Sequence, residues 1–190
     1  MKALILNGEL KGDESFEKAR KLTEEIIAEQ GYETDYILLR EKEIGECLGC
    51  FGCWVKTPGV CVVEDYGRIL AENIINSDMV IFLTPVVYGG YSSELKKALD
   101  RIIPLLLPFF KKVNGEVHHK KRYKKYPKVV VLGMMSEEDN EDKELFESLV
   151  KRNSLNWYNS FVGGIIIDNS EKDIKYQIRD KLKAMEVLRC

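Results

Sequence analysis

The sequence has no long hydrophobic run and almost no net charge. Its longest apolar stretches, such as Ile102–Phe110, are too short to span a bilayer and are interrupted by proline. The formal net charge of −2 provides no global attraction to nucleic acid or to anionic lipid. Residues 1–8 contain an apolar run but lack the length and the small-residue cleavage site of a signal peptide. We therefore expect a cytoplasmic protein without a membrane segment.

Histidine is also scarce. His118 and His119 are the only two, and they stand side by side in a polar stretch. No serine or carboxylate accompanies them in a pattern that would indicate a nucleophilic triad. We therefore predict no catalytic side chain in this chain.

The overall composition is that of an ordinary folded protein. The chain has 190 residues, of which 45% are hydrophobic and 32% are charged. This length and composition predict a single domain over residues 1–190 that buries a large core. Two segments stand out within it, a cysteine-rich loop at 45–62 and a basic connection at 113–127.

Short apolar runs alternate with helical patterns along the chain. Strands are predicted at 3–6, 79–83, 129–132 and 161–167, with a more polar edge strand at 34–39. Helices are predicted at 14–30, 65–76, 93–111, 142–152 and 172–188. Such alternation implies parallel strands, right-handed crossovers and helices on both faces. We therefore predict an α/β fold, a flavodoxin-like three-layer sandwich whose five-stranded parallel sheet has the order 2-1-3-4-5. Ligands bind such sheets beyond the carboxyl ends of the strands.

Cysteine, in contrast, is concentrated in one place. Four of the five cysteines lie close together, at Cys47, Cys50, Cys53 and Cys61. Cysteines three apart on a turning backbone can surround one iron-sulfur cubane, and Gly49 and Gly52 let the backbone pass close to it. A structural zinc site usually has two Cys-x2-Cys pairs separated by a dozen or more residues. The spacing therefore favours iron and sulfur over zinc.

Two simpler interpretations of the cysteines stay open. Free cysteines are often small buried hydrophobic residues, and Cys-x-x-Cys pairs can exchange electrons as thiols without a metal. The loop follows the second predicted strand, so we expect it near the ligand edge of the sheet.

Several blocks of the sequence resemble the iron-sulfur flavoproteins and the wider group of flavodoxin-like, NAD(P)H-dependent FMN reductases. The blocks are Ala3–Gly8, Cys47–Asp65, Thr84–Gly90 and Ser93–Arg101. The resemblance implies an FMN-dependent oxidoreductase that uses NAD(P)H, in which FMN carries the chemistry and the protein positions it. We also expect a small-molecule or protein electron donor and acceptor. A homodimer or homotetramer is expected, because the apolar segment 105–110 can bury against a second subunit.

The resemblance also implies which residues hold the cofactors. The loop after the first strand would hold the FMN phosphate, and the loops after the third and fourth strands would flank the flavin ring. The implied FMN-binding residues are Asn7, Gly8, Lys11, Ser15, Pro85, Val86, Tyr88, Gly89, Gly133 and Met134. One 4Fe-4S cluster, which exchanges electrons with FMN, would be held by Cys47, Cys50, Cys53 and Cys61.

The phosphate loop departs from the expected composition. Such loops are usually rich in small hydroxyl and amide residues at a helix N-terminus. Here Glu9, Asp13 and Glu14 place carboxylates where a phosphate would bind. The alternative function is therefore a flavin-free, flavodoxin-like protein whose cysteine loop is a metal-binding or redox-thiol module.

Lysine and arginine gather in residues 111–125, with tyrosines between them. Such a stretch can bind nucleic acid or the 2′-phosphate of NADPH. We favour a solvated connection or a subunit contact, paired with the acidic run 136–142, and do not expect nucleic acid as a partner. Asp100 and Arg101 are expected to form a structural ion pair or a subunit contact.

Overall fold

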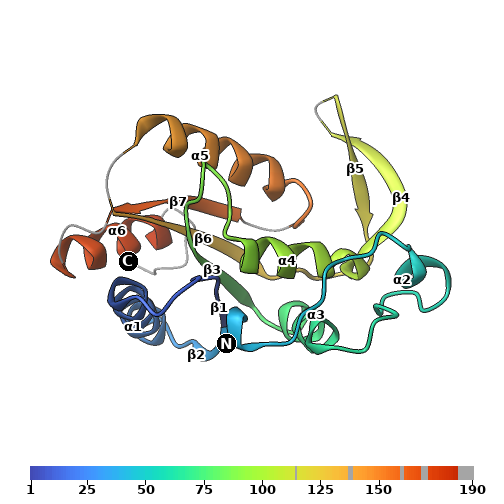
Figure 1. Cartoon of the computed structure of the whole chain (residues 1–190), viewed down its shortest axis with the longest axis horizontal. Coiled ribbons are helices and arrows are strands. Elements are labelled where there is room, and N and C mark those ends of the chain that lie inside the picture. Colours follow the sequence, from blue (N-terminus) through green and yellow to red (C-terminus); the bar gives the residue numbers. More distant parts are fainter. Residues whose placement is uncertain (114, 137–138, 159–160, 168–170, 184–190) are drawn as a thin grey trace.

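Five parallel strands form the central sheet of the computed structural model, in the order β2-β1-β3-β6-β7 (Figure 1). The strands are β1 (Lys2–Asn7), β2 (Glu33–Leu38), β3 (Met79–Pro85), β6 (Lys128–Met135) and β7 (Phe161–Ile167). Numbered among themselves, they have the order 2-1-3-4-5, so the predicted sheet is confirmed. The structure describes residues 1–113, 115–136, 139–158, 161–167 and 171–183.

Helices cover both faces of the sheet. One face carries α1 (Glu14–Ala28) and α6 (Glu171–Lys183), and the other carries α3 (Tyr66–Ile75), α4 (Ser93–Arg101) and α5 (Asn140–Ser154). Successive residues of a strand point to opposite faces. In β3, Phe82 therefore joins the core beneath α3, α4 and α5, whereas Ile81 joins the core beneath α1 and α6. Two buried cores explain why the strands read as continuous apolar runs.

The predicted helix at 93–111 is wrong beyond Arg101. There α4 ends, and a short 3-10 turn, η2 (Ile103–Leu105), follows it. The chain then forms an antiparallel hairpin from β4 (Leu106–Val113) and β5 (Glu116–Lys121). Proline fixes φ and has no N–H to donate, so Pro104 and Pro108 prevent the helix from continuing.

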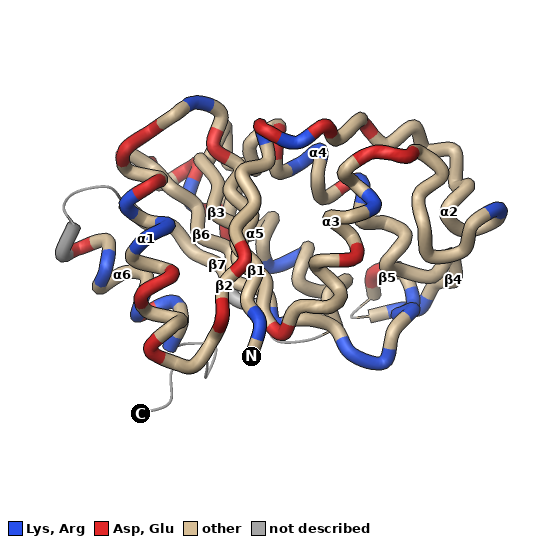
Figure 2. Tube along the Cα trace, turned by 90° about the horizontal axis from the view of Figure 1, so that it is seen from below, with Lys and Arg blue, Asp and Glu red and all other residues tan. Residues whose placement is uncertain are grey.

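Within the predicted basic connection at 113–127, residues 116–121 form β5. Figure 1 shows the hairpin projecting away from the sheet, and Figure 2 shows basic residues on it. Two basic residues that follow β5 bond within the chain: Lys125 Nζ lies 2.5 Å from Asp78 Oδ1, and Arg122 Nε donates to the Pro104 carbonyl at 2.8 Å. We expected this basic stretch to pair with the acidic run 136–142. Among the described residues, Lys125 and Arg122 bond elsewhere instead. Residues 137–138 of the acidic run lie outside the described ranges.

The other predicted helices agree with the structure to within two residues at each described end. Residues 184–188 of the last predicted helix lie outside the described ranges. Asp13 caps α1 and Asp139 caps α5, each accepting backbone N–H bonds, as short polar side chains do at a helix N-terminus. Among the described residues, no helix has the length and apolar character needed to cross a membrane.

Candidate functional site

The cysteine loop runs from η1 (Leu39–Glu41) to α3 and contains the single-turn helix α2 (Gly52–Val55). Gly49 and Phe51 both have left-handed backbone conformations, with φ of 62° and 54°. At Gly52 a Cβ atom would lie only 2.6 Å from Val62 Cγ1. Glycine is therefore needed for the two arms of the loop to approach each other here.

All four clustered cysteines line one small cavity of about 80 Å³, together with residues from the end of α4 and from η2. All four are free thiols; Cys53 is buried, Cys61 is half-buried, and Cys47 and Cys50 are exposed. The pKa of the Cys53 thiol is raised by burial first, then by the nearby Cys61, and less by Cys47 and Cys50. The structure therefore brings these four sulfur atoms around one small volume.

The shared cavity is not by itself an assembled metal site. Among the described residues, no three His, Cys, Asp or Glu side chains form a ligand group for one metal ion. The four cysteines line one cavity, and four thiols are the ligand set that a 4Fe-4S cluster takes, so the donor chemistry of the cavity fits such a group.

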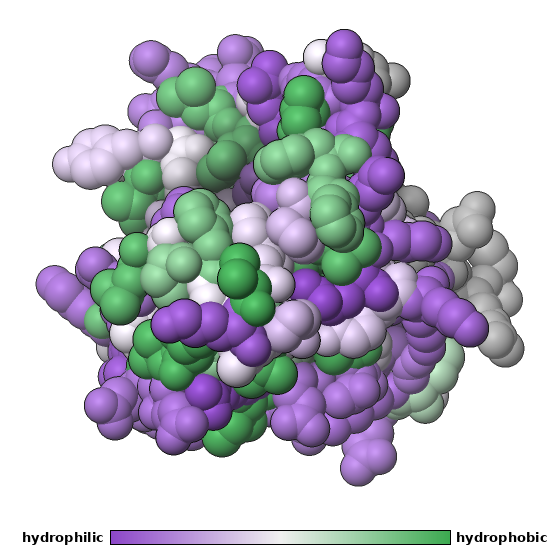
Figure 3. Space-filling view, turned by 90° about the vertical axis from the view of Figure 1, so that its right-hand side faces the viewer, coloured by the Kyte–Doolittle hydropathy of each residue, from purple (hydrophilic) through white to green (hydrophobic). Residues whose placement is uncertain are grey.

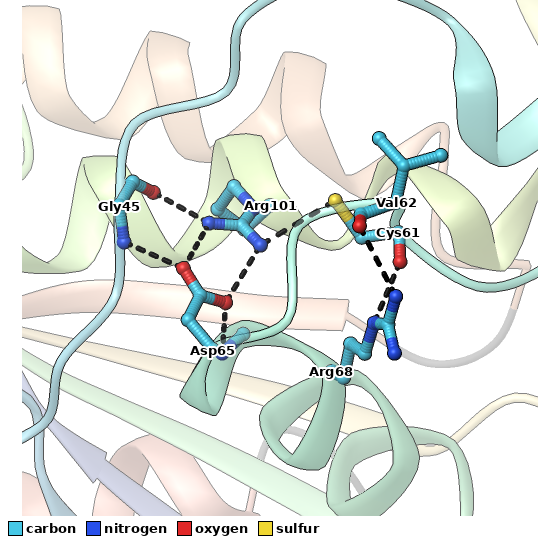
Figure 4. Close-up of polar contacts among 7 residues, drawn as sticks. Gly45, Cys61, Val62, Asp65, Arg68 and Arg101 are labelled. Carbon is cyan, nitrogen blue, oxygen red and sulfur yellow. Dashed lines mark hydrogen bonds and ion pairs between the residues drawn. The ribbon is translucent and has the colours of Figure 1, made fainter.

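Arg101 is the buried cation of this region, with a side chain only 1% exposed (Figure 4). Its Nη1 and Nη2 donate to the two carboxylate oxygens of Asp65 at 2.6 and 2.7 Å. Nη1 also donates to the Gly45 carbonyl at 2.8 Å, and Nη2 donates to Cys61 Sγ at 3.4 Å. Burial opposes the charged form, but the bonds to Asp65 and the nearby Cys61 raise the pKa of Arg101, so it stays charged.

A second arginine holds the backbone of the same segment. Arg68 of α3 donates from Nε to the Cys61 carbonyl at 2.7 Å and from Nη2 to the Val62 carbonyl at 3.1 Å. It is half-buried and forms an ion pair with Glu64 at 3.0 Å. Cys61 is therefore held at its sulfur by Arg101 and at its carbonyl by Arg68 (Figure 4).

Aromatic contacts join the cysteine loop to the hairpin. Trp54 stacks on Phe51 with ring centroids 5.2 Å apart, contacts the His119 ring at 4.9 Å, and donates from Nε1 to the Leu106 carbonyl at 3.0 Å. Figure 3 shows apolar side chains gathered on this side of the molecule. The large exposed apolar residues of the loop and hairpin are Leu48, Phe51, Val55, Val60, Phe109, Phe110 and Val117.

A larger cavity, of about 510 Å³, lies beside the loop and is lined by residues of α4, α5 and the hairpin. Cys47 and Gly49 form part of its wall, and Phe82, Tyr91 and Trp157 supply aromatic surface. Burial raises the pKa of Tyr91 to about 12, so its hydroxyl stays protonated at neutral pH. The charged lining residues, Lys96 and Asp100, pair with each other at 2.6 Å. The cavity therefore offers a largely uncharged surface.

The loops predicted to hold FMN meet at the other end of α4. The strand register places Asn7 beside Leu83 and Thr84 beside Gly133, so the carboxyl ends of β1, β3 and β6 are neighbours. A Cβ on Gly8 would lie 2.8 Å from Ser92 Oγ, the N-cap of α4. The structure thus brings together the predicted positions that follow these three strands. They are Asn7, Gly8, Pro85, Val86, Gly133 and Met134.

Some predicted side chains at this edge belong to the fold itself. Asn7 is buried; its Nδ2 donates to Tyr36 Oη at 3.0 Å, and its Oδ1 accepts from the Glu9 amide at 2.9 Å. Met134 is buried in the core beneath α1 and α6. A Cβ on Gly133 would lie 2.6 Å from Phe146 Cε1. These positions therefore present backbone rather than side chain to the edge.

Tyr88 lies in a tight turn and is 93% exposed. Val87 and Gly90 exchange two backbone hydrogen bonds, and Tyr88 and Gly89 have φ of 49° and 67°, which is the geometry of a type I′ turn. A left-handed tyrosine costs roughly 1–2 kcal/mol. A Cβ on Gly89 would lie 2.5 Å from Leu145 Cβ, so this side of the turn is closely packed. The turn presents an aromatic ring to whatever approaches the edge.

The acidic phosphate loop differs from its sequence-based interpretation. Glu9 is only 6% exposed and pairs with Arg40 at 3.0 Å, so it lies inside the fold with its charge balanced. Asp13 caps α1 by accepting from the Ser15 amide at 2.8 Å, and Glu14 is exposed in the first turn. Lys11 is exposed, and a Cβ on Gly12 would have no atom within 4 Å. Two of the three carboxylates therefore remain near the predicted phosphate site, together with one lysine and open space.

The cysteine cavity and the FMN loops lie at opposite ends of α4. Asp100 and Arg101, at the C-terminal end of α4, line the cysteine cavity, whereas Gly8 lies against Ser92 at the N-terminal end. The nine residues of α4 span about 13 Å. The expectation that the cysteines lie near the ligand edge of the sheet is therefore wrong. The chain before α2 carries them past the far end of α4 (Figure 1).

Arg101 and Asp65 are the site residues that the sequence did not identify in their observed roles. Asp100 and Arg101 were expected to form a structural ion pair or a subunit contact; each forms an ion pair within the chain, Arg101 with Asp65 and Asp100 with Lys96. Both residues lie within the sequence blocks described above, yet they are separated by 36 positions and belong to different elements. No local pattern indicates such a contact.

Comparison with known proteins places these features in a family. Residues 1–135 match the family model for NADPH-dependent FMN reductase. An iron-sulfur flavoprotein of Methanocaldococcus jannaschii is 40% identical over 94 residues, which cover 48% of this chain and 47% of that protein. An iron-sulfur flavoprotein of Methanosarcina thermophila is 29% identical over 105 residues, covering 55% of this chain and 54% of that protein. The chain thus spans about half the length of the curated relatives it matches.

Solved structures share the fold at low sequence identity. The NAD(P)H:quinone oxidoreductase from Methanothermobacter marburgensis superposes with a TM-score of 0.68 and 14% identity, covering 97% of this chain and 94% of that one. An azoreductase from Bacillus anthracis superposes with a TM-score of 0.65 and 12% identity, covering 98% of this chain and 99% of that one. These similarities show a shared fold.

Proposed function

Because the chain belongs to the NADPH-dependent FMN reductase family, we propose that it is a cytoplasmic, FMN-dependent oxidoreductase that accepts electrons from NAD(P)H. The family match includes all three loops predicted to hold FMN. The observation that carries the proposal is the meeting of these loops at the carboxyl edge of the sheet, where open parallel sheets bind ligands. When bound, FMN supplies the hydride and electron chemistry.

At this edge we assign binding mainly to the backbone. The loop from Gly8 to Ser15 leads into the N-terminus of α1 and would receive the phosphate, with Lys11 as the exposed cation. Pro85, Val86 and the chain at Gly133–Met134 would border the flavin ring. The Val86 amide already bonds the Met134 carbonyl at 3.0 Å, which holds these two loops together. Tyr88 would pack against the ring or its surroundings.

We further propose that Cys47, Cys50, Cys53 and Cys61 hold a 4Fe-4S cluster. Their shared cavity supports this, as does the identity to proteins named iron-sulfur flavoproteins. When bound, such a cluster supplies one-electron transfer. The exposure of Cys47 and Cys50 leaves one side of the site accessible to an electron partner.

We place a small-molecule electron acceptor in the larger cavity. Its volume falls in the range of small-ligand sites, and its charged lining residues are already paired. An uncharged acceptor would contact Cys47 and Gly49 of the loop there.

We also propose a homodimer or homotetramer in which the exposed apolar residues of the hairpin meet a second copy. Light scattering of the cofactor-loaded protein tests that assembly.

A second function is favoured by one observation at the predicted phosphate site. The Asp13 carboxylate already caps α1 and competes with a phosphate for the same amides. The alternative is a flavin-free protein that uses the cysteine loop as a metal or redox-thiol module. The two functions differ in whether the purified protein contains FMN.

The deciding experiment is purification without oxygen, followed by an absorption spectrum and by flavin, iron, zinc and sulfide analysis of the same sample. We expect flavin bands together with iron and sulfide. Cys53→Ser should lose iron and keep FMN, whereas the matched variant Cys190→Ser should keep both. Protein that has no flavin absorption and does not bind added FMN would contradict the proposed reductase.

A further inference from the structure

We propose that Arg101 is a positioning residue for the cysteine site: its buried guanidinium fixes Cys61 and raises the reduction potential of the cluster. The inference rests on the cluster part of the proposed function and is independent of flavin. It concerns one charged group at the C-terminal end of α4 and one of the four sulfurs.

The first step is that Arg101 forms a hydrogen bond to a group other than Asp65, its ion-pair partner. A buried charge needs both an opposite charge and bonds for its remaining polar atoms. Asp65 supplies the charge, but Nη2 also donates to Cys61 Sγ at 3.4 Å. Arg101 Nε has no hydrogen-bond partner among the described residues, although it is buried. Leaving a buried donor unpaired is costly, so the position of this side chain is not explained by the ion pair alone.

The second step is that the surrounding chain holds this arrangement in place. The carboxylate of Asp65 accepts from the amides of Gly45 and Gly67 at 2.8 and 2.9 Å, in addition to Arg101. A Cβ on Gly67 would lie 2.9 Å from Asp65 Oδ1 and 3.0 Å from Arg101 Nη2. Larger residues would disturb both groups. The guanidinium of Arg101 is therefore fixed by residues from the cysteine loop and from the start of α3.

The third step concerns charge at the sulfur. At long range, the negative charge of Asp65 offsets the positive charge of Arg101. At short range, the N–H of Arg101 Nη2 is the group that contacts Cys61 Sγ directly. A hydrogen bond to a ligand sulfur stabilises the more negative, reduced form of a cluster. Removing that N–H should therefore lower the reduction potential. A tenfold change in a one-electron equilibrium corresponds to 59 mV.

Arg68 provides a matched control. It binds the same segment of chain, but through the carbonyl oxygens of Cys61 and Val62. It should therefore steady the loop without stabilising the reduced sulfur. A comparison of Arg101 and Arg68 separates an electrostatic effect on the cluster from general loosening of the loop.

The experiment is an anaerobic redox titration of the holoprotein, followed by the electron paramagnetic resonance signal of the reduced cluster. The samples are wild type, Arg101→Gln, Arg101→Lys and Arg68→Gln, each with iron and flavin per chain determined. We expect the equilibrium of Arg101→Gln to shift at least tenfold, to a potential lower by 59 mV or more. Arg101→Lys should recover part of the shift, and Arg68→Gln should match wild type.

Wild-type potential in an iron-loaded Arg101→Gln protein would overturn the inference, as would an equal shift in Arg68→Gln. If Arg101→Gln holds no iron, Arg101→Lys decides: a lowered potential supports the inference and a wild-type potential overturns it. Loss of iron from both Arg101 variants but not from Arg68→Gln supports the positioning of Cys61. Wild-type protein without iron overturns this inference together with the proposed cluster, while its flavin content separately tests the reductase.

Discussion

The two ends of α4 carry opposite kinds of site. At the C-terminal end, side chains form the site: four thiols, a buried ion pair and two adjoining cavities. At the N-terminal end, backbone forms most of it, and the most prominent side chain, Tyr88, lies almost wholly in solvent. The cysteine end is thus organised within one chain. The flavin edge is formed mainly by backbone, with few side chains directed to it.

The largest expected effect comes from breaking the buried pair at the cysteine end. Asp65→Ala leaves the Arg101 charge buried without its partner, which should lower the free energy of unfolding by about 3–5 kcal/mol. Urea unfolding measures this. Lys96→Ala, which removes an exposed pair on the same helix, should cost at most about 1 kcal/mol. Equal losses in the two variants would contradict the contrast between buried and exposed pairs.

The pair of Asp65 and Arg101 should stabilise the protein less in acid than at neutral pH. Burial favours the neutral form of Asp65, but the bonds from Arg101 and from the amides of Gly45 and Gly67 outweigh it and lower the pKa of Asp65. Because the folded pKa lies below the unfolded value of about 3.9, the stabilisation is complete above that value. It is lost as the pH falls through the folded pKa. The stability difference between wild type and Asp65→Ala should therefore shrink in acid, and a difference independent of pH would refute this assignment.

Two glycines allow each end to be disturbed separately. Alanine at Gly52 would meet Val62, and alanine at Gly8 would meet Ser92 and Leu95, so each should cost roughly 1–3 kcal/mol by overpacking. We expect Gly52→Ala to lower iron per chain but not flavin, and Gly8→Ala to do the reverse. Gly12→Ala, in open space, should leave both contents unchanged. Loss of both cofactors from either variant would show that the two ends are not independent.

The smallest effect is expected from the charge of Asp13. Asp13→Asn keeps an acceptor for the N-cap bond but removes a carboxylate next to the predicted phosphate. FMN binding should strengthen by ~0.3–1 kcal/mol, or about two- to fivefold, and less at high salt. Titration of the apoprotein with FMN measures this. An unchanged affinity for FMN, or a gain that does not shrink at high salt, would contradict this assignment.

The sheet could be predicted because its central strands β1, β3 and β6 are buried on two faces and therefore read as apolar runs, while β2 reads as a more polar edge strand. The hairpin could not, since residues 105–110 are apolar enough to continue the preceding helix. The useful signals were Pro104 and Pro108, which a helix interior does not tolerate, and Asn114-Gly115, a dipeptide typical of two-residue hairpin turns.

The convergence of the cysteines could be expected from their spacing, but not their place in the fold. The position of the cysteines depends on the irregular segment before α2. The sequence of that segment has no helical or strand periodicity from which its path could be predicted. The pairing of Arg101 with Asp65 depends in turn on how α3 and α4 lie side by side. Glu9 was misread for a similar reason, because its partner Arg40 lies in η1, 31 positions further along the sequence.

The aromatic contacts of Trp54 have a practical consequence. The chain has only two tryptophans, Trp54 and Trp157, and they lie in different surroundings. Trp54 lies between Phe51 and His119 in the cysteine loop, whereas Trp157 lines the larger cavity and packs against Phe82. Iron bound by the loop should quench the emission of Trp54, and a molecule entering the larger cavity should quench that of Trp157. The protein thus carries two built-in fluorescent reporters, one in the cysteine loop and one in the wall of the larger cavity, which can be followed without a label.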